Sequence, residues 1–122
     1  MLWVQSGCGD LCGNDILSES ISPDGSKRAV LFLRGCGAST DPNWQVSILD
    51  SKQTLPNEGG NVFVVDSDHG VVQQMKLEID WRGSDNLVVS YPTRARVFHQ
   101  SSTVKGIRIS YEKMKYPPAP AE

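Results

Sequence analysis

Apolar and polar residues alternate along several short segments of this chain. At 75–82 apolar residues alternate with charged ones, and the same period of two recurs at 44–48 and 107–112. A period of two places the apolar side chains on one face of a β-strand. No window of eleven or more residues keeps a helical apolar stripe with capping signals at both ends. The pattern therefore predicts an all-β fold.

The turns between these segments predict how the strands connect. The segments 29–33 and 62–65 are apolar on both faces, which is typical of central strands. Turn-forming residues at 22–25, 83–86 and 100–102 predict hairpins between the strands on either side of each. We expect about eight short antiparallel strands in a meander, folded as a β-sandwich or a strongly twisted sheet. They lie near 16–21, 28–34, 44–49, 62–65, 75–81, 87–91, 96–99 and 104–112.

The two halves of the chain also resemble each other weakly, with an offset of about 60 residues. Two similar four-strand halves would give this pattern, and so would any β-meander. A chain of 122 residues has room for one hydrophobic core. We therefore expect an N-terminal lead segment at 1–14, a single β domain at 15–115 and a Pro-rich, disordered tail at 116–122.

Composition and charge exclude several classes of protein. The chain is 39% hydrophobic and 21% charged, which is typical of a folded domain rather than a disordered one. Its net charge of −2, with scattered basic residues, argues against nucleic-acid binding. No apolar run approaches the length of about 18 residues that a membrane span needs. A protein partner or a small ligand is the expected interaction.

The three cysteines leave at least one thiol without an intramolecular cysteine partner. Three Cys with His69 or His99 would supply four zinc ligands, but a second closely spaced pair is missing, which argues against zinc. A disulfide between Cys12 and Cys36 is expected if the protein is exported. In a reducing cytoplasm the same residues would be buried thiols, or Cys36 would be a reactive nucleophile.

The densest group of potential metal ligands is Asp66, Asp68 and His69, on a turn after an apolar strand. Aspartates in turns more often accept hydrogen bonds from the backbone, and a divalent ion would need further oxygen ligands. We therefore predict no metal, no cofactor and no catalytic residues. A small metal-dependent enzyme built on these residues, or a thiol enzyme using Cys36, is the alternative.

Two surfaces are candidates for binding. Arg94, Arg96 and Phe98 share one predicted strand face, and Lys105 or Arg108 is expected opposite them on the neighbouring strand. Arginine beside an aromatic ring is common at binding surfaces, although a solvated strand face gives the same pattern.

The second candidate is the irregular loop at 50–61, with Asn57, Glu58 and Asn61 as its exposed polar residues. Our first hypothesis is a binding module that uses this loop or an exposed sheet edge. Because a small meander leaves its edges unpaired, we also expect a homodimer. A structural protein of the cell envelope is a further alternative.

Three motifs carry a resemblance: Ser22-Pro23-Asp24-Gly25, Arg34-Gly35-Cys36-Gly37-Ala38, and Leu55-Pro56-Asn57-Glu58-Gly59-Gly60-Asn61-Val62-Phe63. Together they resemble a family of short β-rich bacterial proteins. The resemblance implies a bacterial single-domain protein, exported or lipoprotein-like, and similar to some proteins of mobile gene cassettes. It implies no activity. Residues 4–8 also resemble a degraded lipoprotein cleavage box, but the apolar segment that precedes such a box is missing. These features slightly favour the bacterial envelope over the cytoplasm.

Overall fold

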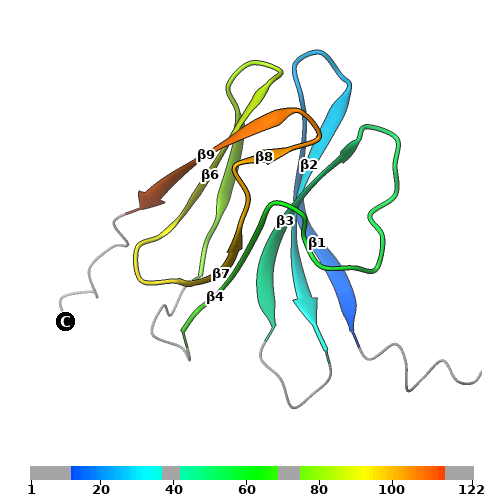
Figure 1. The fold of residues 1–122 in the computed structure, drawn as a ribbon. Helices are drawn as coiled ribbons and strands as arrows, with labels where there is room; N and C mark the ends of the chain where they lie inside the picture. Colours follow the sequence, from blue (N-terminus) through cyan, green and yellow to red (C-terminus); the bar gives the residue numbers. More distant parts are fainter. Residues whose placement is uncertain (1–11, 37–41, 69–74, 115–122) are drawn as a thin grey trace, which may run out of the picture.

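The computed structural model describes residues 12–36, 42–68 and 75–114 of the chain. Within these ranges nine strands and no helix form two sheets that pack face to face (Figure 1). The strands are β1 (Gly13–Ile21), β2 (Lys27–Gly35), β3 (Asn43–Asp50), β4 (Phe63–Asp66), β5 (Glu78–Trp81), β6 (Asn86–Pro92), β7 (Arg96–Gln100), β8 (Thr103–Val104) and β9 (Ile107–Met114). The larger sheet has the order β1-β2-β3-β4-β7 and the smaller sheet the order β5-β6-β9-β8. The all-β prediction is confirmed.

The main core lies between the two sheets and takes apolar side chains from both. At its centre the ring of Phe63 lies 5.0 Å from that of Tyr91 and 5.2 Å from that of Tyr111, centroid to centroid. Tilted ring pairs at this separation add to the stabilisation that burial provides. The predicted apolar faces of 44–48, 75–81 and 107–111 all contribute to this core.

A smaller core lies on the outer face of the larger sheet. It consists of Val30, Phe32 and Leu49, with Leu55 of the following loop packed against them. The loop thus covers part of the polar face of 44–48, where Gln45 and Ser47 are only 4% exposed.

Hydrogen bonds from the loop explain how these polar side chains tolerate burial. The backbone N–H of Gly60 donates to Gln45 Oε1 at 2.6 Å, and that of Asn61 donates to Ser47 Oγ at 3.1 Å. The side-chain amide of Asn61 bonds both the N–H and the carbonyl of Ile48, at 2.9 and 3.0 Å. The loop therefore extends the sheet's hydrogen bonding, which offsets the desolvation of the buried groups.

Two of the three predicted hairpin turns, at 22–25 and 83–86, form where the sequence predicted them. Gly25 has φ +77°, a left-handed conformation that glycine adopts without strain. The Asp24 carboxylate accepts hydrogen bonds from the backbone N–H of Ser26 and from the hydroxyls of Ser22 and Ser26, which lowers its pKa to about 2. The Asp24 N–H donates to Ser84 Oγ at 3.0 Å. The tips of the β1–β2 and β5–β6 hairpins therefore meet (Figure 1).

The path of the chain after β7 differs from the prediction. The turn at 100–102 does not fold β7 back onto β9, because β7 pairs with β4 in the larger sheet. The last predicted strand divides into β8 and β9 at a tight turn where Lys105 and Gly106 have φ of 52° and 79°. β9 then pairs with β6 in parallel, so antiparallel pairing does not hold throughout.

The parallel pairing also makes the strand arrangement of the second half of the chain different from that of the first. In the first half β2 and β3 are antiparallel, whereas their counterparts β6 and β9 are parallel. The two halves are therefore not two copies of one four-strand arrangement. The β structure begins at Gly13, close to the predicted start of the domain. The predicted tail at 116–122 and most of the lead segment lie outside the described residues.

Candidate functional site

Exposed apolar side chains gather on β1, an edge strand of the larger sheet whose only partner among the described residues is β2. Four large hydrophobic side chains are exposed in the described part of the chain, and three of them belong to β1. They are Ile16, Leu17 and Ile21, each between 46% and 51% exposed. A long edge strand with exposed apolar side chains can pair with another strand.

A β-bulge lies in the middle of β1. The register with β2 shifts between Ile16 and Ser18, so that Leu17 has no partner opposite it. A bulge bends the strand and redirects the side chain of the extra residue. Here it leaves Leu17 half exposed on the edge of the sheet.

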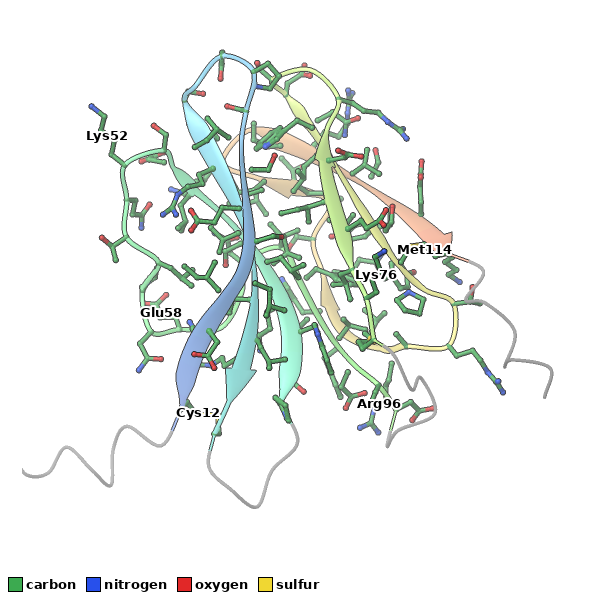
Figure 2. All side chains as sticks on the ribbon, turned by 180° about the vertical axis from the view of Figure 1, so that it is seen from behind. Cys12, Lys52, Glu58, Lys76, Arg96 and Met114 are labelled. Carbon is green, nitrogen blue, oxygen red and sulfur yellow. A yellow bond between two sulfur atoms is a disulfide. The ribbon has the colours of Figure 1, made fainter. Side chains whose placement is uncertain are left out.

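A groove with a volume of about 700 Å³ borders β1 on the outer face of the larger sheet. We call it the outer groove. Its walls come from Asn14 and Ile16 of β1, Arg28 of β2, and Lys52 and Leu55 of the loop after β3. Figure 2 shows this loop, with Lys52 labelled, beside the larger sheet. Apolar side chains and two basic groups thus face the same hollow.

Arg28 joins the parts of the outer groove. Its guanidinium forms an ion pair with Glu19 of β1 and donates a hydrogen bond to the carbonyl of Gln53 in the loop. Its side chain is only 13% exposed, and its Nε is buried without a hydrogen-bond partner among the described residues. The charge of Arg28 is therefore used to hold β1 and the loop together rather than to meet solvent.

A second groove, of about 380 Å³, lies on the other side of β1, between that strand and β5. We call it the inner groove. Glu19, Glu78 and Asp80 are the charged residues in its walls, and Leu77 and Ile79 supply apolar surface. Beside it the indole Nε1 of Trp81 donates to the Ser20 carbonyl at 3.0 Å. That hydrogen bond ties the edge of the smaller sheet to β1.

The beginning of β1 is fixed by covalent and polar contacts. A disulfide joins Cys12 to Cys36, directly beyond the last paired residues of β1 and β2. The Asn57 side chain donates to the Cys12 carbonyl at 3.1 Å and accepts from Arg34 at 2.9 Å. Arg34 also donates to the side chain of Asn14, at 2.8 Å. The start of β1 is therefore held to both β2 and the loop.

These contacts show how the residues of the predicted binding loop are used. The amides of Asn57 and Asn61 are hydrogen-bonded within the protein, whereas Glu58 is exposed. Within the loop, Lys52, Leu55 and Asn57 are among the residues that line the outer groove. Cys36 lies in a disulfide and therefore has no free thiol for nucleophilic chemistry.

The predicted patch of Arg94, Arg96 and Phe98 lies at the opposite edge of the same sheet. The guanidinium of Arg96 lies 5.0 Å from the centre of the Phe98 ring. It also pairs with Asp66 at 2.7 Å and approaches Asp68 at 4.0 Å, and the hydrogen bond with Asp66 raises the pKa of Arg96. Arg94 belongs to the turn before β7 and is exposed. The structure therefore brings Arg96 and Phe98 together, with Arg94 beside the strand.

The basic residues expected opposite this patch lie elsewhere. Lys105 and Arg108 flank the β8–β9 turn of the smaller sheet, whereas the neighbour of β7 is β4. That prediction is wrong because the hairpin on which it depended does not form.

The acidic turn after β4 contributes to ion pairs with Arg96. Asp66 and Asp68 both face Arg96, and the Asp66 carboxylate also accepts the Asp68 N–H at 2.8 Å. The third predicted ligand, His69, lies outside the described residues. Within the ranges that the structure describes, no group of three or more His, Cys, Asp or Glu residues is placed to hold a metal ion.

Sequence reasoning missed the apolar edge at Ile16, Leu17 and Ile21. A signal was present: Ile16 and Leu17 are adjacent in an otherwise polar strand, which breaks the alternation. Two consecutive apolar residues at such a point are typical of a bulge.

Comparisons of the chain with models of protein families, with curated proteins and with solved structures found no match. The resemblance to short bacterial proteins therefore stays a prediction. In the part of the chain that the structure describes, no helix is long and apolar enough to cross a membrane.

Proposed function

We propose that this domain is a binding module that adds an extended peptide segment of a partner protein to the free edge of β1. The observation that carries the proposal is the pair of grooves on either side of this strand. Side chains of an added strand point alternately to the two faces of a sheet. Along β1 one set would enter the outer groove and the other set the inner groove.

The length and surface of β1 support this mode of binding. A strand of nine residues spans about 30 Å, which is enough for several main-chain hydrogen bonds to a peptide. In recognition by strand addition, main-chain hydrogen bonds supply affinity and hollows for alternate side chains supply specificity. The exposed side chains of Ile16, Leu17 and Ile21 add apolar surface that a partner would bury.

The acidic charge of β1 favours a different partner over a second copy. The strand carries Asp15 and Glu19 and contains no Lys or Arg. Antiparallel pairing of two β1 strands would bring the two Asp15 carboxylates to one seam, beside the two Glu19 carboxylates that are paired with Arg28, and like charges across strands are destabilising. The predicted homodimer is thus the less favoured occupant of this edge, and light scattering at high protein concentration tests it.

The disulfide supports a protein that works in an oxidising compartment. Structural disulfides persist outside the reducing cytoplasm, and Cys12–Cys36 holds the strand to which we assign binding. We include the bacterial envelope in the proposal on this basis, with binding rather than catalysis as the role.

A peptide selection followed by N-methylation tests the proposal. Nine-residue peptides displayed on phage are selected on the folded, disulfide-containing domain, and each backbone nitrogen of a selected peptide is then methylated in turn. We expect binding to fall at every second position, because alternate N–H groups of an added strand face β1. Sensitivity without a period of two, or a library that yields no binder, would contradict strand addition.

A further inference from the structure

We infer that the peptide bound at β1 runs antiparallel to it and carries two large apolar side chains four residues apart, which pack on Ile16 and Ile21. This inference rests on the proposed function and specifies which residues of the ligand are recognised. It follows from the pairing of β1 with β2, which fixes the direction of the backbone groups and side chains of the edge strand.

The hydrogen bonds to β2 determine which backbone groups of β1 face the free edge. The N–H of Ser22, directly after β1, donates to the Lys27 carbonyl at 2.9 Å. In an antiparallel pair, residues that bond the neighbouring strand alternate with residues whose N–H and C=O point away from it. Ile21 and Glu19 therefore present their backbone groups to the free edge. Because β2 is regular across the bulge, the same alternation along β2 gives Ile16 this orientation too.

The two exposed isoleucines of β1 lie on the same face of the sheet, although they are five residues apart. Ile16 is paired with Phe32 and Ile21 with Arg28, and the side chains of directly paired residues share a face. Phe32 belongs to the smaller core on the outer face, and Arg28 lines the outer groove. In a regular strand a separation of five would place the two isoleucines on opposite faces. The bulge at Leu17 brings both to the outer face.

Strand β2 shows the spacing that a straight partner strand meets along β1. Its residues opposite Ile16 and Ile21 are Phe32 and Arg28, which are four residues apart. A peptide added to the other side of β1 meets the same two positions, so its residues opposite the isoleucines are also four apart. We assign the antiparallel direction because antiparallel pairing is the more stable of the two per residue.

Large apolar side chains at these two peptide positions fit the outer face. Ile16 and Ile21 are 46% and 51% exposed, and Ile16 borders the outer groove together with Leu55. Cross-strand pairs of apolar or aromatic side chains bury such surface. On the inner face, β1 carries Ser18 and Ser20 opposite buried core residues of β2. Their side chains are short and polar, so we assign the apolar anchors to the outer face.

Three labelled nine-residue peptides of one composition test the spacing by fluorescence anisotropy. Each is threonine except for two isoleucines, which are three, four or five residues apart. We expect the peptide with a spacing of four to bind about tenfold more tightly than the other two, because each of those places one isoleucine on each face.

Variants of the domain locate the preference on β1. Ile16→Thr combined with Ile21→Thr should remove it, and each single substitution should reduce it, which serves if the double variant is unstable. Phe98→Thr makes a comparable change at the opposite edge of the sheet and should preserve the preference.

Methylation of the peptide backbone connects the anchors to the pairing. In antiparallel addition the peptide residues opposite Ile16 and Ile21 also donate their N–H groups to β1. Methylating either isoleucine nitrogen of the spacing-four peptide should therefore prevent binding, whereas methylating the nitrogens next to them should not. Parallel addition would reverse this result, because the peptide residues that bond β1 would then have their side chains on the inner face.

The outcomes separate the inference from the function beneath it. Equal binding of the three peptides would overturn the spacing rule and leave strand addition standing. The same holds for inhibition by methylation beside the isoleucines, or for a preference that survives the double substitution. If none of the three binds, peptides selected by display decide. Apolar pairs four apart at methylation-sensitive positions would support the rule, their absence would overturn it, and a library without a binder would end both proposals.

Discussion

The two edge strands of the larger sheet, β1 and β7, both contain a β-bulge, but the surroundings of the two bulges differ. Each strand contains a β-bulge, and the extra residue of each is a large exposed hydrophobic: Leu17 in β1 and Phe98 in β7. Bulges at sheet edges interrupt uncontrolled pairing and redirect a side chain. In β7 the redirected ring is covered on one side by Arg96, whereas Leu17 lies between two grooves.

This difference shows why exposure alone is a weak criterion for a binding site. Phe98 is the most exposed large hydrophobic of the described residues, yet its strand has only five residues and its neighbouring arginine is held by Asp66. β1 has nine residues, and both grooves are walled in part by its side chains. Hollows that can accept alternate side chains are what give an edge the means to select a partner.

The largest expected effect comes from removing the covalent anchor of β1. Replacing Cys12 and Cys36 together by serine should lower the free energy of unfolding by about 3 kcal/mol, as expected for a cross-link that closes a loop of this size. Urea denaturation measures the loss. Amide exchange should accelerate more near the start of β1 than in β7. Equal acceleration at both edges would contradict a local anchor.

The next largest effect is on peptide affinity, and it should differ between substitutions at the two bulges. Leu17→Lys should weaken peptide binding about tenfold, which corresponds to about 1.4 kcal/mol, because it places a charge where an apolar contact is expected. Phe98→Lys is the matched control at the other edge and should leave the affinity unchanged. Titration of a selected peptide gives both values. If Phe98→Lys weakens binding as much as Leu17→Lys, the assignment to β1 is wrong.

The hydroxyl of Tyr111 should contribute less to the free energy of unfolding than the disulfide does. Its hydroxyl lies 2.6 Å from the Ser101 carbonyl and 3.2 Å from the Val62 carbonyl. Tyr111→Phe should therefore cost about 1 kcal/mol of unfolding free energy, measured by urea denaturation, while peptide binding at β1 stays unchanged. A loss of peptide binding would show that the two edges are coupled.

Tyr111 should also make the free energy of unfolding depend on pH in the alkaline range. Burial raises the pKa of the Tyr111 hydroxyl above its ordinary value of 10.0. The unfolded chain then loses this proton first, so the stability that the neutral hydroxyl provides is present below about pH 10 and is lost as the pH rises above it. Tyr111→Phe should remove this component of the alkaline loss. An identical pH profile in the variant would contradict the assignment.

The smallest effect is expected at the hairpin tips, which lie away from both grooves. The lowered pKa of Asp24 means that its ionised form stabilises the fold above its ordinary pKa of 3.8. That contribution is lost as the pH falls from 3.8 toward 2. Asp24→Asn should flatten the dependence of the urea midpoint on pH in this interval. A variant as acid-sensitive as the wild type would exclude this role.

The sequence predicted the parts of the fold that local pattern determines. Alternation identified the core faces, and the turn at 22–25 identified the first hairpin, because backbone and side chains there act over a few residues. The burial of Gln45 depends on a loop fifteen residues away, which no local pattern encodes. The chain crosses from the larger to the smaller sheet at 101–102, between β7 and β8, and the tight turn at Lys105-Gly106 then joins β8 to β9 within the smaller sheet.

The candidate site was only partly accessible to the same reasoning. An exposed sheet edge was among the surfaces that the sequence suggested, and a Cys12–Cys36 disulfide was one of its interpretations of the cysteines. Both grooves arise between segments apart in sequence: Ser20 accepts a hydrogen bond from Trp81, and Arg28 donates one to Gln53 of the loop. Such hollows depend on how sheets and loops pack, so they could not be derived from periodicity.

The central claim is that β1 gains a partner strand, and residue-resolved amide hydrogen exchange tests it most directly. The domain is compared with and without a saturating amount of a selected peptide. The account predicts that exchange slows at alternate amides of β1, with no change in β7 and no dependence on protein concentration in the free domain. Protection that appears in β7 instead, or in β1 of the peptide-free domain as its concentration rises, would contradict it.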